Sequence, residues 1–288
     1  MISGQSVLIT GAAHGIGAET ARRLAARGAR VSLVGLGDLE AVAADCPGSA
    51  VFEADVTDPD ALAAAVDGTV EALGGIDTLF ANAGIAAPGF LRTQDASVYE
   101  RMIEVNLIGV WRTIRACLPH VIERRGYILP VASMAAILPP VGLTAYGAAK
   151  SGVENLGHAL RVEVQGFGVG VGVAYFSWID TEMVRGGDKT ALGAMRAEIR
   201  GPLAKTHPVS AAAEAVVRGI DRRSRIVACP RWLIPLMWAK PLLPALTRAG
   251  MGKHIPRFDA LAESEAGIGP VGAGGAAEAA ARDKATAH

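Results

Sequence analysis

The chain has 288 residues, 51% of them hydrophobic and 19% charged, which is enough apolar material for a sizeable core and excludes wholesale disorder. Its 28 Lys plus Arg residues balance 28 Asp plus Glu residues, so no net charge draws the chain to nucleic acid or to anionic surfaces. The three cysteines, Cys46, Cys117 and Cys229, are far apart and form no CxxC pair or Cys/His cluster. We therefore expect reduced thiols and no metal site.

The beginning of the chain leads directly into a strand pattern. Residues 1–10 lack the basic flank and the small-residue cleavage site of a secretion signal. No stretch approaches the ~20 uninterrupted apolar residues of a membrane span. We therefore expect a cytoplasmic protein with no nucleic-acid partner and no transmembrane segment.

Short apolar runs alternate along the chain with longer amphipathic ones. The runs expected to form strands are residues 7–10, 30–34, 51–54, 78–81, 126–131, 169–175 and 226–228. The segments expected to form helices are residues 15–27, 59–73, 98–118, 144–167 and 211–222. This alternation predicts an α/β fold, in which a doubly wound parallel sheet of Rossmann type carries helices on both faces. The ligand site is expected at the carboxyl ends of the strands.

The end of the chain departs from this alternation. We expect residues 1–260 to form a single dinucleotide-binding and catalytic domain, in which 231–260 are an apolar C-terminal extension. Pro235, Pro241 and Pro244 forbid one continuous helix across that extension. It could pack as core, cover the substrate cleft or make peripheral contact with a membrane surface. Residues 261–288 are rich in Ala and Gly and are expected to form a flexible tail.

A glycine-rich loop, TGAAHGIG at residues 10–17, follows the first expected strand. Gly11 permits a tight turn, Gly15 lets the backbone approach a diphosphate, and Gly17 permits close packing of the next helix on the strand. His14 and Ile16 complete the loop at the helix start, where amides and the helix dipole favour phosphate. Three glycines also occur at ordinary turns, but their position between a strand and a helix favours a nucleotide site.

Two further strand ends carry candidate cofactor residues. Asp55, followed by Val56, either accepts a hydrogen bond from an adenine amino group or caps the next turn. After the fourth strand, Ala83 and Gly84 keep the wall beside the adenine ribose thin, and Asn82 can brace the strand ends. A simple turn would also explain this trio.

Four polar residues form a candidate catalytic group. Tyr146 and Lys150 are four residues apart on an expected helix, so their side chains share one face, as those of an exposed pair would. An ammonium lowers the pKa of a nearby phenol, which can then transfer a proton to a carbonyl oxygen. Ser133 lies just past the fifth strand and would face the same cleft. Asn106, in mid-helix between apolar neighbours, suits either a polar network or a hydrogen bond to backbone.

Together these motifs resemble the short-chain dehydrogenase/reductase family over about residues 5–230, in the family's order and spacing. The resemblance implies an NAD(P)-dependent oxidoreductase (EC 1.1.1.-) that interconverts a secondary alcohol and a ketone by hydride transfer, with Tyr146 as general acid/base. It also implies that Ser133 orients the substrate oxygen, that Lys150 lowers the tyrosine pKa and binds the nicotinamide ribose, and that Asn106 holds a water. An epimerase or dehydratase on the same scaffold and a non-enzymatic dinucleotide sensor are alternatives, although a sensor would be expected to lack Tyr146 or Lys150.

Two departures from the family pattern concern the pocket and the cofactor. Ile179 and Thr181 match the positions that contact the nicotinamide carboxamide, but Phe176-Ser177 replaces the usual Pro-Gly. The bulky Phe176 and Trp178 are expected to reshape the pocket.

At the end of the second strand, Gly35 stands where NAD-preferring relatives usually carry Asp, and Leu36 where NADP-preferring relatives often carry Arg. His14 takes the place of a Lys or Arg of some NADP-binding relatives. The sequence thus slightly favours NADP over NAD, with Asp38 as the candidate ribose ligand if NAD is preferred.

Expectations on substrate and assembly also follow from the resemblance. In the family, the region after the sixth strand walls the substrate pocket, and here it contains Trp178, Met183 and Leu203. We therefore expect a lipophilic alcohol or ketone as substrate. Small residues such as Ala148 and Gly152 would let the 144–167 helix pair closely with another, which predicts a homodimer or homotetramer, although internal packing would also explain them.

Overall fold

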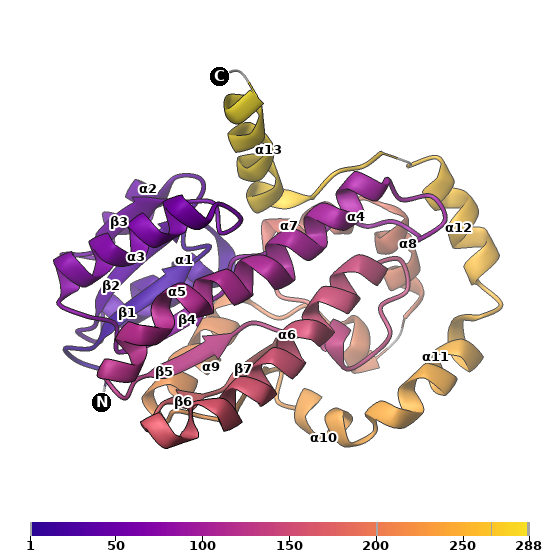
Figure 1. The fold of residues 1–288 in the computed structure, drawn as a ribbon. Coiled ribbons are helices and arrows are strands. Elements are labelled where there is room, and N and C mark those ends of the chain that lie inside the picture. The colour runs from indigo at the N-terminus through magenta and orange to yellow at the C-terminus, as the bar shows by residue number, and fades with distance from the viewer. Residues whose placement is uncertain (1, 200, 266, 287–288) are drawn as a thin grey trace.

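The computed structural model describes residues 2–199, 201–265 and 267–286 (Figure 1). Its centre is a parallel sheet in the order β3-β2-β1-β4-β5-β6, and β7 pairs in parallel with β8. The strands are β1 (Ser6–Thr10), β2 (Arg30–Gly35), β3 (Ala50–Glu53), β4 (Thr78–Ala81), β5 (Tyr127–Pro130), β6 (Gly170–Val171), β7 (Val173–Phe176) and β8 (Ile226–Cys229). The α/β, doubly wound fold predicted from the sequence is confirmed, and its strand order reverses between β1 and β4.

The helices follow the strands in alternation and then dominate the end of the chain (Figure 1). Those of the first part are α1 (Gly15–Ala25), α2 (Leu39–Ala43), α3 (Pro59–Leu73), α4 (Ala96–Ile103), α5 (Val110–Glu123) and α6 (Thr144–Glu163). Those of the second part are α7 (Glu182–Gly187), α8 (Ala191–Glu198), α9 (Val209–Asp221), α10 (Leu233–Trp238), α11 (Leu243–Met251), α12 (Ile255–Glu263) and α13 (Gly272–Thr286).

Both faces of the sheet are covered, and β1 shows how. Its five residues are all buried, as expected of a central parallel strand. Val7 and Ile9 belong to one hydrophobic cluster with Leu24 of α1 and Val216 of α9. The alternate residue, Leu8, belongs to a second cluster on the other face, to which α3, α5 and α6 contribute. The sheet therefore holds two cores apart and fixes where its strand ends lie.

Two expected elements are interrupted. The helix expected at 98–118 is α4, a π-helix at Glu104–Gly109 and then α5. The strand expected at 169–175 is split into β6 and β7 at Gly172, where a Cβ would overlap the Tyr127 hydroxyl. Both interruptions depend on contacts with distant parts of the chain, which local periodicity does not report.

Part of the apolar extension at 231–260 packs on the core. Leu233 and Leu243 are buried in the second hydrophobic cluster, which supports the core-packing interpretation for one side of α10 and α11. As expected, the prolines prevent one continuous helix, because a 3-10 turn at Lys240–Leu242 separates the two helices. Within the described residues, no helix is long and apolar enough to cross a membrane.

The segment at 261–288, expected to be a flexible tail, contains the end of α12 and the helix α13 in its described part. The Val271 amide donates a hydrogen bond to the Ala86 carbonyl oxygen (2.9 Å), which attaches this segment to the loop after β4. Of the small α6 residues, Gly152 packs within the chain against Leu107, whereas Ala148 is exposed. The homodimer or homotetramer stays a prediction.

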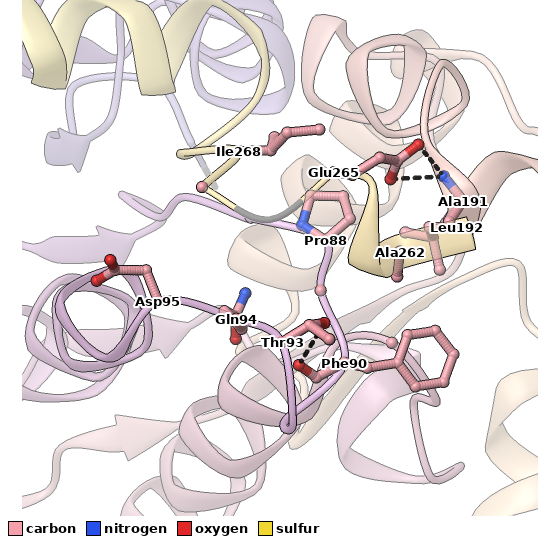
Figure 2. A pocket seen from close by; sticks show the side chains of 13 residues that line it. Pro88, Phe90, Thr93, Gln94, Asp95, Ala191, Leu192, Ala262, Glu265 and Ile268 are labelled. Atoms are coloured by element: carbon pink, nitrogen blue, oxygen red, sulfur yellow. Dashed lines mark hydrogen bonds between the residues drawn. The ribbon is translucent and has the colours of Figure 1, made fainter. Parts of the chain in front are cut away.

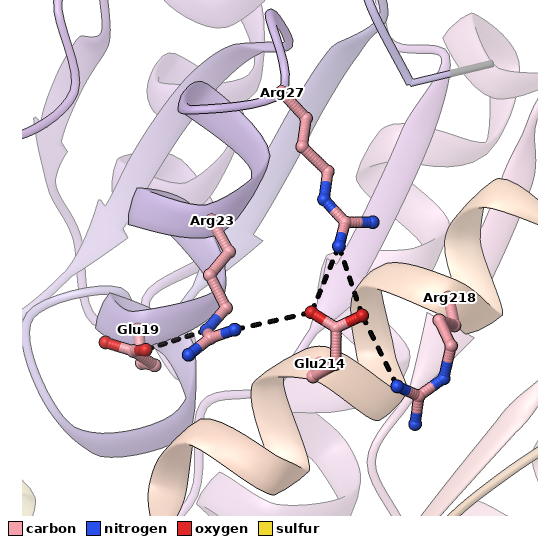
Figure 3. A network of polar contacts seen from close by, with 5 residues as sticks. All are labelled: Glu19, Arg23, Arg27, Glu214 and Arg218. Carbon is pink, nitrogen blue, oxygen red and sulfur yellow. Dashed lines mark hydrogen bonds and ion pairs between the residues drawn. The ribbon is translucent and has the colours of Figure 1, made fainter.

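An ion-pair network joins α1 to α9 (Figure 3). The Glu214 carboxylate of α9 lies 3.3 Å from Arg23 and 3.1 Å from Arg27, both on or just after α1. Burial raises the pKa of Glu214, but the hydrogen bond and charge of Arg27, with the charges of Arg218 and Arg23, outweigh it, so that the pKa is lowered. The carboxylate therefore stabilises the folded chain.

We expect Glu214→Ala to lower the free energy of unfolding by about 1 kcal/mol at neutral pH, because three guanidinium groups lose their shared partner. Since the folded pKa lies below the ordinary 4.5, this contribution is complete above pH 4.5 and is lost as the pH falls further. Urea unfolding at two pH values measures it, with the exposed Glu163→Ala as control. An equal effect of both substitutions would contradict the assignment.

Candidate active site and cofactor cleft

A cleft of about 560 Å³ lies at the carboxyl ends of β1, β4 and β5, where the strand order reverses. Its size is typical of small-molecule and cofactor sites. The structure brings nearly all predicted site residues to its walls: Gly11, His14, Gly15, Ile16, Gly35, Asp55, Val56, Asn82, Ala83, Gly84, Asn106, Ser133, Tyr146, Lys150, Ile179 and Thr181. Gly17 lies behind the wall, where a Cβ would overlap the Gly11 carbonyl oxygen, so it permits close packing of α1 on the loop.

The glycine loop is shaped to receive phosphate. Gly11 has φ of +63°, and a Cβ there would lie 2.8 Å from the Ala83 Cα. Asn82 braces the strand ends, since its Nδ2 donates to the carbonyl oxygens of Thr10 (3.0 Å) and Gly11 (3.1 Å). The first turn of α1 carries no acidic residue, so its amides and the positive end of its dipole face the cleft unopposed. These features fit a dinucleotide diphosphate.

Two carboxylates already have partners: Asp55, which lines the cleft, and Asp38, which does not. Asp55 accepts from the Thr57 amide (2.9 Å) and pairs with Arg101 (2.7 Å), so its side chain caps the turn, as the second interpretation held. Burial raises the pKa of Asp55, but these two partners outweigh it and the pKa is lowered. Asp38, the candidate ribose ligand, caps α2 by accepting a hydrogen bond from the Ala41 amide (3.0 Å). Its carboxylate therefore already has a partner within the chain.

Lys150 is the buried centre of the catalytic group. It is only 2% exposed, its Nζ donates to the Val131 carbonyl oxygen (2.9 Å), and it lies 5.5 Å from the centre of the Tyr146 ring. Burial lowers the pKa of Lys150 to about 8. The wall above it must be thin, because a Cβ at Gly84 would lie only 2.6 Å from the Asn106 Oδ1.

The Ser133 hydroxyl neighbours the Tyr146 phenol in the wall of the cleft. Burial raises the pKa of the Tyr146 phenol, and the Ser133 hydroxyl opposes that rise. The lowering of the phenol pKa by Lys150, expected from the resemblance, is therefore not seen in this structure. The physical reason is that desolvation of the phenol outweighs its neighbours.

Asn106 lies in the π-helix between α4 and α5 and is fully buried. Its Oδ1 accepts from the Ile85 amide (3.1 Å), and its Nδ2 donates to the carbonyl oxygens of Ile85 and Met102 (both 2.9 Å). The side chain thus holds the loop after β4 in place, which agrees with the backbone-bonded alternative. Its role as a water holder stays a prediction. A π-helical turn at such a position is common at functional sites.

Sequence reasoning missed several residues of the cleft. Arg22 and Arg185 reach its rim, where each pairs with a carboxylate, and Ala273 and Gly274 close it from the C-terminal segment. Arg22 could have been found from the sequence, because it lies two helical turns after the glycine loop on the same expected helix. Nothing in the sequence indicated that Ala273 and Gly274, far along the chain, would reach the cleft.

Two residues expected in the pocket wall lie elsewhere. The Trp178 Nε1 donates to the Leu203 carbonyl oxygen (2.9 Å), and the Arg196 guanidinium lies 4.4 Å from the centre of the Trp178 ring. Neither Trp178 nor Leu203 lines the cleft among the described residues, whereas Phe176 and Met183 do. The sequence did not predict this position of Trp178, because it depends on pairing with a distant segment, in which Ile179 forms a β-bridge with His207.

Comparison with known proteins decides the family. The profile of the family described as short chain dehydrogenase matches residues 5–191. The chain belongs to the short-chain dehydrogenase family. Among the relatives of this short-chain dehydrogenase, (-)-trans-carveol dehydrogenase of Rhodococcus erythropolis is 35% identical over 64% of the chain and 74% of its own length. Cis-4-hydroxycyclohexanecarboxylate dehydrogenase of Sinomonas cyclohexanicum is 34% identical over 70% of the chain and 81% of its own length.

A relative that aligns over more of the chain and a solved structure support the same family. 11-beta-hydroxysteroid dehydrogenase 1A of Arabidopsis thaliana is 30% identical over 86% of the chain and 74% of its own length. The crystal structure of levodione reductase superposes with a TM-score of 0.70 at 30% identity, over 78% of this chain and 96% of its own. The dehydrogenase and reductase activities in these names support an oxidoreductase of alcohols and ketones that uses a nicotinamide nucleotide.

The C-terminal segment of this short-chain dehydrogenase also holds α8 (Figure 2). Both carboxylate oxygens of Glu265 accept from the Ala191 amide (2.9 Å each), which caps the first turn of α8 from far along the chain. Arg92 pairs with Asp259 (2.9 Å) and more loosely with Glu263 (3.3 Å). A narrow pocket of about 10 Å³ remains between these elements.

We expect Glu265→Ala to speed amide hydrogen exchange in the first turn of α8 by about threefold to thirtyfold, the range for loss of a helix cap. Mass spectrometry of the peptide that contains Ala191 measures it. Glu263→Ala, which removes a more exposed carboxylate of the same segment, is the matched control. Unchanged exchange in the Glu265 variant would show that the cap does not hold α8.

Lys150→Met should stabilise the fold while it damages catalysis. Because the folded pKa of Lys150 lies near 8 and its ordinary value is 10.5, holding the charge at pH 7 costs about 3 kcal/mol, and the cost declines as the pH rises from 8 to 10.5. The lost hydrogen bond to Val131 offsets about 1–2 kcal/mol of the gain. Urea unfolding should show a net gain of about 1–2 kcal/mol at pH 7 and no gain, or a loss of up to about 1 kcal/mol, at pH 10. A loss of stability at both pH values would contradict the assignment.

Proposed function

We propose that this short-chain dehydrogenase interconverts a lipophilic secondary alcohol and the corresponding ketone, with NADP or NAD as hydride carrier and Tyr146 as general acid/base. One observation carries the proposal. Tyr146, Ser133 and the buried Lys150 ammonium line the same cleft as the glycine loop. The names of the relatives, which include carveol and hydroxycyclohexanecarboxylate dehydrogenases, favour redox chemistry over epimerisation or dehydration.

Each residue of the group has a task in this reaction. Ser133 donates to the substrate oxygen and orients it against Tyr146. Tyr146 donates its phenolic proton to that oxygen during reduction and accepts it during oxidation. Lys150 holds a ribose hydroxyl of the cofactor and restores the tyrosine proton. The bound nicotinamide would supply or accept the hydride.

The cofactor would be held along the full cleft. The amides at the start of α1 would bind the diphosphate, and Ile179 and Thr181 would contact the nicotinamide end. Thr181 lies against the glycine loop, since a Cβ at Gly15 would be 3.1 Å from its Cγ2. Asn82, Ala83 and Gly84 would form the wall beside the ribose.

The pocket near the reacting group favours an apolar substrate. Ile85, Phe176, Met183 and Val184 line the cleft there. Apolar walls with few polar groups bind substrates of the same character. The carveol and the steroid in the names of two relatives have this character.

Tyr146→Phe keeps the ring and removes the transferable proton, so turnover should fall by about 10²–10⁴-fold while cofactor binding persists. Rates with a panel of cyclic ketones and alcohols, and nicotinamide fluorescence for binding, measure both quantities. Tyr99→Phe is the matched control, because Tyr99 packs against the same hydrophobic cluster. Near-full activity of the Tyr146 variant would remove the assignment.

Cofactor preference should depend on Leu36, which lines the cleft beside Gly35. Gly35 is a poor position for a test, since its φ is +153° and a Cβ would lie 3.3 Å from the Gly11 amide nitrogen. Leu36→Asp should weaken NADP binding relative to NAD by about tenfold or more, through repulsion of the 2′-phosphate.

The control is Leu36→Asn, which has the same shape without the charge. Dissociation constants of both cofactors are compared for the three proteins. We expect the parent protein to bind NADP slightly more tightly. A strong preference of the parent for NAD would overturn that expectation.

A further inference from the structure

The outer side of α10 and α11 is an exposed apolar surface at the edge of the molecule (Figure 1). Between Arg231 and Arg248 every fully exposed residue is apolar, and we call this set the apolar ridge: Pro235, Trp238, Pro241, Leu242, Pro244, Ala245 and Leu246. Trp238 is 87% exposed, Leu242 65% and Leu246 62%. These three large apolar side chains follow one another at intervals of four residues. Removal of each from water would be favourable.

The ridge is held rigidly from behind. Leu233 of α10 and Leu243 of α11 are buried in the core. Lys240, between the two helices, pairs with Glu154 of α6. The exposure of Trp238 is therefore a property of docked helices and not of a loose end.

The stretch of sequence that contains the ridge carries charge of one sign, and two of its cations, Lys240 and Arg257, pair with Glu154 and Glu198 of other elements. Residues 222–258 contain no Asp or Glu, whereas Asp221 and Asp259 bound the stretch. The same stretch contains eight cationic side chains: Arg222, Arg223, Arg225, Arg231, Lys240, Arg248, Lys253 and Arg257. Arg231, Arg248 and Lys253 are exposed, and no carboxylate of the described residues forms a salt bridge with them. In a chain of zero net charge, this is a marked separation of charge.

This combination selects among the possible partners. A second copy of the chain, seated through the same ridge, would bring like charges together, which disfavours that pairing. A nucleic acid would place its charged backbone against an apolar centre, which is unfavourable. An anionic lipid bilayer satisfies both features, since Trp and Leu side chains enter the interface while Arg and Lys contact the headgroups.

We propose that the apolar ridge of α10 and α11 docks this enzyme on the surface of anionic lipid bilayers. The contact is peripheral, because the ridge consists of two short helices that lie along one side of the molecule. The inference does not rest on the proposed function and holds for any reaction in the cleft.

Flotation with vesicles tests the proposal. The full-length protein should float with vesicles of phosphatidylcholine and phosphatidylglycerol in equal amounts, and at least about tenfold more weakly with phosphatidylcholine alone. The double variant Trp238→Ser/Leu242→Ser should lose about tenfold or more of the vesicle binding. The matched control is Val162→Ser/Phe167→Ser, which removes two other apolar side chains, 72% and 55% exposed.

A variant without the exposed cations distinguishes binding to anionic lipid from nonspecific hydrophobic adsorption. Arg231→Gln/Arg248→Gln/Lys253→Gln should reduce binding to the anionic vesicles and leave the weak binding to phosphatidylcholine unchanged. Circular dichroism and thermal unfolding establish that each variant is folded. Absence of flotation with both vesicles, or equal loss in the ridge and control variants, would overturn the proposal. Light scattering in which the ridge variant alone changes a dimer to a monomer would overturn it as well, because the ridge would then be a subunit interface.

Discussion

A lysine ammonium buried under the loop after β4 is the constraint around which the site is built. A buried cation is costly unless fixed partners surround it. Here the Val131 carbonyl at the end of β5 accepts its hydrogen bond, and the loop above it must include Gly84 because any Cβ would strike the Asn106 amide at 2.6 Å. The position of Asn106 in turn requires the π-helical turn that displaces it toward Ile85. Chemistry and backbone geometry are therefore coupled at one point of the sheet.

The same coupling explains what could be predicted from the sequence. The strands and long helices follow from hydrophobic periodicity. The family motifs locate the site because each requires a particular residue type at a strand end or on a helix that lines the cleft. The π-helix could not be predicted, since it depends on Asn106 meeting the backbone of Ile85 across the chain. The break at Gly172 depends likewise on the hydroxyl of Tyr127. Periodicity reports local preference, and these features arise from contacts between distant segments.

The C-terminal third of the chain was the hardest part to predict from the sequence. The family profile ends at residue 191, and α10 to α13 lie beyond it. Composition alone indicated a loose tail, because Ala and Gly offer little surface to bury. The order of the described segment comes instead from a few long-range polar contacts, such as Glu265 with Ala191 and Val271 with Ala86. Through Ala273 and Gly274 the same segment reaches the cleft, so residues beyond the family profile meet residues within it.

In the proposed reaction, the nicotinamide would exchange a hydride with the carbonyl carbon and Tyr146 a proton with the carbonyl oxygen of one substrate in this cleft. The most direct measurement is a single turnover of the full-length protein with cofactor deuterated at the transferable position and a cyclic ketone. Deuterium should appear at the carbinol carbon of the alcohol, with a slower transfer step than for the undeuterated cofactor. Binding of either cofactor without transfer to any of a broad panel of cyclic ketones, or product without deuterium, would contradict it.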